Sequence, residues 1–359
     1  MHRARVLYVP NEAGNFRQDG FRRPFADLEK AGLLEAVSVF SLQLRIKDGG
    51  DPEEHRQELI SRVRDFQPTI VLMQHLGATG LRSRHFAQMR SAASFELIYH
   101  EGDPYSRLLH PLPLSARAAG RAADVTFTVG TATFAENFRS VGAADVRYSP
   151  SAFEPERFRA PSSEVREHDI VIVANRNRPR LRGHPNWRER IAFVTYMQDR
   201  FGGRLALFGN GWEGPGARGP VDFSKQDEAI KSGWITANWD HYAGEESYFS
   251  NRLPISLASG SIHATTSHPG YDRIFSGVSG DFITYASTHE VLADSIEEIL
   301  DRTSVEERLQ MGDRAREFAY ENFRQDDHLV KMLNFRTTII DPQTSKLLWN
   351  LDTFPLLEI

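Results

Sequence analysis

The chain has 359 residues, a length that suits two domains of ordinary size better than a single core. Its hydrophobic content of 40% and charged content of 25% are those of soluble globular proteins, and its formal net charge of −5 argues against nucleic acid as a partner. It contains no cysteine, which excludes disulfides, thiolate catalysis and cysteine-based metal sites.

The N-terminus shows no targeting signal. Its apolar run covers only a few residues and no cleavage-like segment follows. No stretch reaches the roughly 20 apolar residues that a membrane-spanning helix needs. The sequence therefore predicts a cytoplasmic protein, and it leaves a peripheral membrane contact and an oligomeric state open.

Strand-like and helical segments alternate through the first half of the chain. Strands are expected at 5–10, 36–40, 68–75, 95–100, 125–129 and 146–148. Helices are expected at 22–31, 53–66 and 131–140. This alternation predicts a mainly parallel sheet covered by helices.

Residues 149–169 break the alternation with three prolines and several charges, and are interpreted as an interdomain linker. A second alternating set follows. Strands are expected at 170–174, 205–209, 234–238, 261–266 and 282–285, and helices at 187–201, 226–231, 251–259, 289–300, 305–321 and 325–336. The prediction is an α/β protein with two Rossmann-like, doubly wound domains facing a central cleft. The N-terminal domain spans 1–155, the C-terminal domain 165–335, and a tail over 336–359 either packs back on the N-terminal domain or forms a subunit contact.

The segment 248–275 is the most informative part of the chain. It predicts a helix that Asn251 and Arg252 open and Gly260 ends, followed by a short strand and a Pro-Gly turn. Ligands of doubly wound domains bind outside the carboxyl ends of the strands. Thr265 and Thr266 are therefore expected to line a ligand crevice.

This helix resembles the donor-site helix of two-domain (GT-B) glycosyltransferases. The likeness is strongest to the spore-maturation CgeB-like group and to the family 4-type enzymes, through Asn251, Arg252, Leu257, Ala258 and Gly260. Further similarities lie at 123–128, 142–158, 207–212 and 291–323. The resemblance implies a nucleotide-sugar donor site in the C-terminal domain and an acceptor site in the N-terminal domain.

The Arg-rich loop 174–184 follows the first strand of the C-terminal domain. In retaining GT-B enzymes a similar position holds the donor diphosphate, so the resemblance implies this role for Arg176, Arg178 and Arg182. Arg252 is a second diphosphate candidate. The alternatives are a solvated basic loop for the first three and a salt bridge to Glu245 or Glu246 for Arg252.

One position departs from the family pattern. Where related enzymes carry a Glu that binds the donor ribose, this chain has Ile255. An isoleucine cannot accept those hydrogen bonds, so ribose recognition shifts to another residue or is lost. Asn251, Ser250 and Ser256 are the polar neighbours that compensate if it shifts.

Titratable residues end two strands of the N-terminal half. His75 ends one strand, and His100 and Asp103 follow the next, where any of them can act as general base on an acceptor hydroxyl. Gly14, directly after the first strand, can allow close backbone approach to a sugar or phosphate. The alternatives are a structural histidine at 75 and a turn cap at Asp103. No metal site is expected, because His100, Glu101 and Asp103 are too closely spaced on an extended chain.

The prediction is a hexosyltransferase-like enzyme that moves a sugar from a nucleotide-diphosphate donor, UDP- or GDP-linked, to a glycan, lipid-linked or small-molecule acceptor. It needs no cofactor or metal, and retention is slightly favoured. A catalytically degenerate homologue that serves as a binding or scaffolding subunit is the alternative. A dinucleotide-dependent oxidoreductase lacks support, since no G-x-G-x-x-G follows the first strand of either domain.

Overall fold

The computed structural model describes residues 3–12, 17–158, 166–176 and 184–334. The chain divides into two compact units. The first is formed by the chain up to Pro150 and again from Gln325, and the second by Ser151–Arg324. The expected tail over 336–359 lies outside the described residues.

The first unit contains a six-stranded sheet in the order β2-β1-β3-β4-β5-β6, in which every neighbouring pair is parallel. Its strands are β1 (Ala4–Val9), β2 (Leu34–Val39), β3 (Ile70–Gln74), β4 (Glu96–Glu101), β5 (Val125–Thr128) and β6 (Val146–Tyr148). Because β2 and β3 lie on opposite sides of β1, the strand order reverses between β1 and β3, which is where doubly wound sheets bind ligands.

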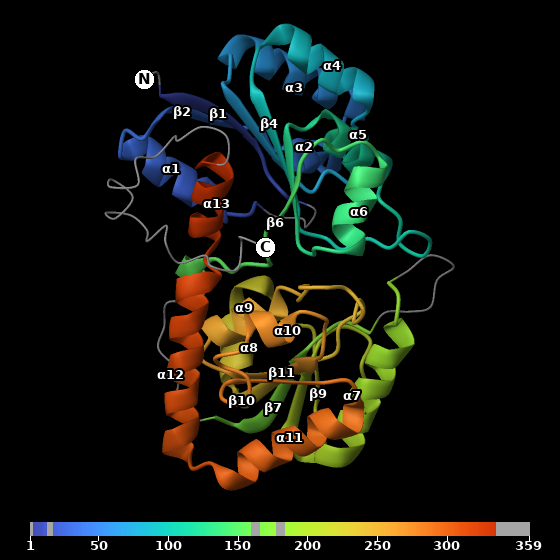
Figure 1. Ribbon diagram of the computed structural model, residues 1–359, viewed down its shortest axis with the longest axis vertical. Helices are drawn as coiled ribbons and strands as arrows, with labels where there is room; N and C mark the ends of the chain where they lie inside the picture. The colour runs from blue at the N-terminus through green and yellow to red at the C-terminus, as the bar shows by residue number, and fades with distance from the viewer. Residues whose placement is uncertain (1–2, 13–16, 159–165, 177–183, 335–359) are drawn as a thin grey trace. The chain divides into compact units, whose positions relative to one another are not determined.

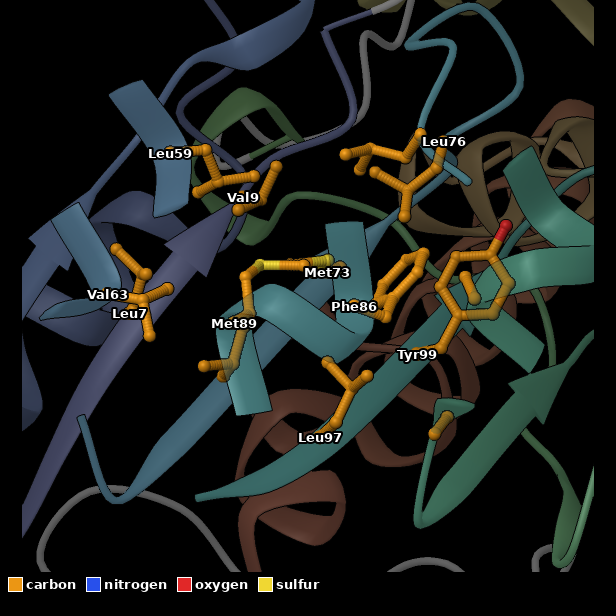
Figure 2. Close-up of a cluster of buried hydrophobic side chains, with 14 of the residues drawn as sticks. Leu7, Val9, Leu59, Val63, Met73, Leu76, Phe86, Met89, Leu97 and Tyr99 are labelled. Carbon is orange, nitrogen blue, oxygen red and sulfur yellow. The ribbon is translucent and has the colours of Figure 1, made fainter. Parts of the chain in front are cut away.

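Helices cover both faces of this sheet (Figure 1). They are α1 (Arg22–Lys30), α2 (Leu42–Asp48), α3 (Pro52–Phe66), α4 (Ser83–Ala92), α5 (Leu114–Ala122), α6 (Thr133–Ser140) and α13 (Gln325–Asn334). One core packs α3, α4 and α5 against the strands, and Figure 2 shows Phe86 and Met89 of α4 meeting Met73, Leu97 and Tyr99. The other core packs α1 and α13 against the opposite face.

The second unit repeats the architecture with the order β12-β11-β10-β7-β8-β9, again parallel throughout. Its strands are β7 (His168–Val173), β8 (Leu205–Phe208), β9 (Ala217–Gly219), β10 (Gly233–Asn238), β11 (Ile262–Thr266) and β12 (Ile283–Ala286). Its helices are α7 (Trp187–Phe201), α8 (Gln226–Lys231), α9 (Arg252–Ala258), α10 (Tyr271–Ile274), α11 (His289–Arg302) and α12 (Val305–Asn322), with short 3-10 turns η1 (Pro155–Phe158), η2 (Gly202–Arg204) and η3 (Phe223–Lys225). The strand order reverses at β7.

The two units divide the chain differently from the sequence expectation. Helix α13, expected at the end of the C-terminal domain, packs in the first unit, because Leu329 and Leu333 are buried in the same core as the strands of that unit. The expected linker also contains packed residues. Phe153 and Phe158 are buried in the second unit, and the Phe153 N–H donates to the Phe323 carbonyl at 2.9 Å.

The predicted fold class is confirmed, and every expected strand forms. Helices α2, α4, α5 and α10 and strand β9 were not expected. The α5 segment is built of small residues such as Ala116, Ala118 and Gly120, whose apolar signal is weak although they are buried. Gly120 faces Phe138, and a Cβ there would lie 2.7 Å from that ring, so only glycine lets α5 and α6 pack this closely. None of the helices in the described part of the chain has the length and apolarity needed to cross a bilayer.

Candidate functional site

The carboxyl edge of the first sheet brings His75 next to Glu101. Strands β3 and β4 are paired so that Gln74 lies opposite His100, and the next residue of each strand therefore falls at the same level. The His75 N–H donates to the His100 carbonyl at 3.1 Å, and His75 adopts a left-handed backbone conformation with φ of 44°. This conformation is uncommon for a residue other than glycine, and it ends β3 at His75.

Glu101 holds the imidazole of His75 in place. His75 Nδ1 lies 2.8 Å from Glu101 Oε1 and 3.3 Å from Asp103 Oδ2. Glu101 is fully buried, and its other oxygen accepts from the Tyr99 hydroxyl at 2.5 Å. Burial by itself lowers the pKa of His75, but the charge and hydrogen bond of Glu101 outweigh it and raise that pKa to about 9.

These side chains could also hold a cation. One ligand atom each from His75, Glu101 and Asp103 lies within 4.8 Å of the others. Imidazole and carboxylates suit divalent ions such as Zn²⁺ or Mn²⁺. The sequence predicts no metal site, because His100, Glu101 and Asp103 are too close together on an extended chain. The histidine that joins the two carboxylates is His75, from the neighbouring strand.

His100 lies on the opposite face of the sheet from Glu101, since successive side chains of a strand alternate between faces. Its Nδ1 is 2.9 Å from Gln74 Nε2, and its ring stacks on Phe21 with centroids 6.1 Å apart. Burial lowers the pKa of His100 to about 4, so its ring is neutral at physiological pH. The structure thus brings His75 and Asp103 together and keeps His100 apart from them.

The loop after β1 reaches the same edge through residues that sequence reasoning missed. Glu12 is fully buried and pairs with Arg22 at 2.5 Å. The Glu12 N–H donates to Gln43 Oε1, and Gln43 Nε2 donates to the His75 carbonyl, each at 2.6 Å. An acidic residue soon after the first predicted strand was the available signal. Gly14, the predicted residue of this loop, lies outside the described residues.

The carboxyl edge of the second sheet carries the predicted donor residues. Arg252, at the start of α9, donates from Nε to the Val173 carbonyl at the end of β7 at 2.7 Å. In the described part of the chain it forms no ion pair, so the salt bridge weighed as an alternative is not found there. Arg176 is exposed next to the same strand end. Arg178 and Arg182 lie outside the described residues.

A Gly-Asn-Gly-Trp turn fixes the backbone near Arg176. The Arg176 N–H donates to the Asn210 carbonyl at 2.9 Å, and Trp212 Nε1 donates to the Ala174 carbonyl at 2.6 Å. Gly209 has φ of 145°, and a Cβ there would lie 1.9 Å from the Ala174 oxygen. Only glycine allows the turn after β8 to approach the end of β7 this closely.

Thr265 and Thr266 do not line an open crevice. Both are buried, with exposures of 1% and 2%. The Thr265 hydroxyl lies 3.5 Å from Asn238 Nδ2, and the Thr266 hydroxyl accepts from the Asp240 N–H at 2.9 Å. Their hydroxyls hold the loop after β10 against β11. Asn251, by contrast, is exposed at the beginning of α9.

Asp240 is the centre of this buried network. Its Oδ2 lies 3.2 Å from His268 Nε2, and its Oδ1 accepts from Asn238 Nδ2 at 2.8 Å and faces Arg190 at 3.9 Å. Burial alone raises the pKa of Asp240, but the hydrogen bond and charge of His268 and the charge of Arg190 hold it below its usual range. The carboxylate is therefore ionised and structural.

Nitrogen-bearing side chains gather beside this network. The pKa of His241 is lowered to about 2, first by burial and then by the charges of Arg190, His184 and Arg252. The rings of His184 and His241 stack in parallel with centroids 4.9 Å apart. Four nitrogen-bearing side chains near one sheet edge, with Arg176 exposed at the adjacent strand end, form the kind of environment that binds a phosphate anion.

Ile255, in place of the family's Glu, is buried with an exposure of 4%. Ser256, one of the residues expected to compensate for it, lines a small pocket with Arg252, Asn238 and His263. Ser250, just before α9, has a buried hydroxyl without a hydrogen-bond partner among the described residues. Two serine hydroxyls thus lie close to Ile255 in the chain, although neither has the reach of a glutamate.

No protein-family model and no curated protein matches the sequence significantly. Solved structures do match the fold. A glycosyltransferase from Rickettsia africae is 10% identical with a TM-score of 0.61, over 94% of this chain and 98% of that one. Sucrose-phosphate synthase from Thermosynechococcus elongatus is 12% identical with a TM-score of 0.58, over 93% and 98%. HepE from Anabaena, in complex with UDP and glucose, is 11% identical with a TM-score of 0.58, over 92% and 100%.

At these identities the likeness establishes the fold and not the reaction. The chain therefore has the GT-B fold, with two Rossmann-like domains.

Proposed function

We propose that this protein is a glycosyltransferase of the CgeB-like or family 4-type group, which transfers a hexose from a nucleotide-diphosphate sugar to an acceptor hydroxyl. The observation that carries the proposal is the guanidinium of Arg252 at the carboxyl edge of the second sheet, with the exposed Arg176 at the adjacent strand end. Arg252 offers a guanidinium without a carboxylate partner in the described residues, next to His184 and His241. Negative charge grows on the leaving diphosphate as the glycosidic bond breaks, and such groups stabilise it.

The first unit supplies a base in this proposal. Nδ1 of His75 donates to Glu101, which leaves Nε2 to accept a proton. The acceptor oxygen attacks the anomeric carbon, the bond from that carbon to the phosphate oxygen breaks, and the hydroxyl proton passes to His75 Nε2. The nucleoside diphosphate leaves with the electron pair. A single displacement of this kind inverts the anomeric centre, so assigning the base role to His75 departs from the retention that the resemblance of the Arg loop slightly favours.

The donor nucleotide is UDP or GDP in this proposal. HepE, which shares the fold, was solved with UDP. A thermal-shift panel against UDP, GDP, dTDP, ADP and CMP, each near millimolar, tests it. A ligand at about a hundred times its dissociation constant stabilises the folded state by roughly 2.7 kcal/mol, which raises the melting temperature visibly. We expect a rise with one diphosphate and none with its nucleoside.

The reaction is also proposed to need no metal. Turnover of the responding nucleotide sugar should be unchanged by EDTA. If EDTA abolishes turnover and Mn²⁺ or Zn²⁺ restores it, the metal-independent proposal fails, and the cluster of His75, Glu101 and Asp103 becomes the candidate cation site.

Ile255 favours a second candidate, a binding or scaffolding subunit that has lost catalysis. A panel without any shift, together with no hydrolysis of nucleotide sugars, is the result that supports it. Diphosphate binding without turnover would point the same way, because the donor site would be intact and the chemistry absent.

A further inference from the structure

A short turn after β4 carries two exposed leucines. The Ser106 N–H donates to the His110 carbonyl at 2.9 Å, and the His110 N–H donates to Ser106 Oγ at 2.7 Å. These two hydrogen bonds close a turn whose tip consists of Arg107, Leu108 and Leu109. One backbone and one side-chain hydrogen bond thus close the turn below the tip.

The base of this turn is anchored in the first unit. Tyr105 is 3% exposed, and its ring centroid lies 5.0 Å from that of His110. Asn137 of α6 is itself buried and donates to the Tyr105 carbonyl at 2.9 Å. Since the base is fixed, the leucines at the tip project outward from a rigid support.

The leucines are exposed to an unusual degree. Leu108 is 85% exposed and Leu109 51%, and Leu114, at the start of α5, is 57% exposed. Among the described residues, these three are half of the six large hydrophobic side chains that are exposed, and they lie within one short segment. Exposed apolar side chains that gather in one place indicate an interaction surface, whereas single ones do not.

Arginines are the charged residues of the tip and of the start of α5, although the exposed Asp103 precedes the turn. Residues 104–123 contain no aspartate or glutamate, while the chain as a whole is acidic. Arg107 lies at the tip, and Arg117 is exposed on α5. Apolar side chains flanked by arginines suit the interface of an anionic bilayer, where the leucines enter the acyl boundary and the guanidinium groups meet lipid phosphates.

The segment also ends beside the proposed base. A Cβ placed on Gly77 would lie 3.5 Å from Pro113 Cγ and 3.7 Å from His75 Nε2, so Pro113 and His75 are close neighbours. A lipid surface bound by the turn would thus lie close to His75 Nε2, the nitrogen that takes the acceptor proton in the proposed reaction.

We propose that the turn 105–110 docks the protein on an anionic lipid surface and that the acceptor is a lipid-linked hydroxyl. The docking stands on the exposed leucines and arginines alone. The acceptor class rests on the proposed function, because it requires His75 to be the base.

Vesicle sedimentation with the full-length protein tests the docking. Vesicles of phosphatidylcholine with a quarter phosphatidylglycerol are compared with pure phosphatidylcholine. We expect binding to the anionic vesicles, and at least about tenfold weaker binding for L108S/L109S, since each leucine loses the gain of apolar burial. Arg107→Gln should weaken binding about fivefold at low salt. The control V291S/V305S replaces exposed apolar residues of the second unit and should bind like wild type.

Three results would overturn the proposal. The first is wild-type protein that stays in the supernatant with both vesicle types. The second is a double serine variant that binds unchanged. The third is a wild-type dimer by light scattering that L108S/L109S converts to a monomer, because a second copy of the chain would then cover the leucines. The thermal-shift panel contains no lipid. If no nucleotide raises the melting temperature, the proposed function is wrong and the docking proposal still stands. If a nucleotide raises the melting temperature but the protein does not sediment with vesicles, only the docking proposal is wrong.

Discussion

The imidazole of His75 and the carboxylate of Glu101 form a hydrogen-bonded pair across two neighbouring strands, with Nδ1 2.8 Å from Oε1. Each residue comes from the end of its own strand, and the parallel register of β3 and β4 brings them together. Glu101 also accepts hydrogen bonds from the Tyr99 hydroxyl and from the Asp103 N–H, which fix the orientation of its carboxylate. The carboxylate in turn orients the imidazole of His75.

Replacing His75 should remove turnover without removing donor binding. His75→Asn is the variant of choice, because asparagine tolerates the left-handed backbone conformation of this position. General base catalysis contributes about a hundredfold to ten-thousandfold, so turnover should fall by at least about a hundredfold. The nucleotide-induced thermal shift should stay the same. His100→Ala, on the opposite face, is the matched control and should keep most of the turnover. The reverse ranking of the two variants would remove His75 from the role of base.

The raised pKa of His75 predicts alkaline activity. A base with a pKa of about 9 is mostly protonated at pH 7, so kcat/KM should rise with pH and level off near pH 9. Glu101→Gln removes the charge that raises this pKa, so its profile should level off at lower pH and at a lower maximum. A wild-type profile that is flat between pH 7 and 9 would contradict the assignment.

Arg252→Ala should separate diphosphate binding from nucleoside binding. A hydrogen bond to a charged group contributes about 1.5–3 kcal/mol, so affinity for the nucleoside diphosphate should fall about tenfold to a hundredfold. Affinity for the nucleoside should hardly change. Calorimetric titration measures both. Arg204→Ala, which breaks a pair with Asp169 at the amino edge of the same sheet, is the control and should leave both affinities alone. Equal losses for the two ligands in Arg252→Ala would point to a folding defect.

Asp240→Asn should destabilise the second unit in a pH-dependent way. The change leaves Arg190 without its buried counter-charge, and we expect a loss of about 3–5 kcal/mol at pH 7 by urea unfolding. The folded pKa of Asp240 is lowered, so its contribution is present above the unfolded pKa of about 4 and is lost as the pH falls toward the folded value. The gap between wild type and variant should therefore narrow below pH 4. Asp281→Asn breaks an exposed pair with Arg314 and should change stability by no more than about 1 kcal/mol.

Gly209→Ala should damage both stability and nucleotide binding. The new Cβ would meet the Ala174 carbonyl at 1.9 Å, and φ of 145° disfavours any L side chain. We expect a loss of about 2 kcal/mol or more in the free energy of unfolding. The affinity for diphosphate should also fall, since the turn positions the Arg176 backbone. Gly203→Ala has no atom within 4 Å of its Cβ and should be nearly neutral in both measurements.

The sequence determined the fold through local patterns. Apolar runs such as Ile70–Gln74, separated by amphipathic segments, predict strands and helices from neighbouring residues alone. Glycine positions added turns, because the conformation of Gly209 excludes other residues. The strand end that carries His75 and the start of the helix that carries Arg252 were therefore predictable as positions at a ligand-binding edge.

Only the tertiary structure decided which of these residues meet. The sequence placed His100 beside Glu101 as chain neighbours, but alternation along the strand sends their side chains to opposite faces, and the register of β3 and β4 supplies His75 instead. Thr265 and Thr266 were expected at an open crevice, yet the loop after β10 folds over them. Helix α13 joins the first unit because its leucines find their apolar partners there. Each of these outcomes depends on contacts between residues far apart in the chain, which no local pattern encodes.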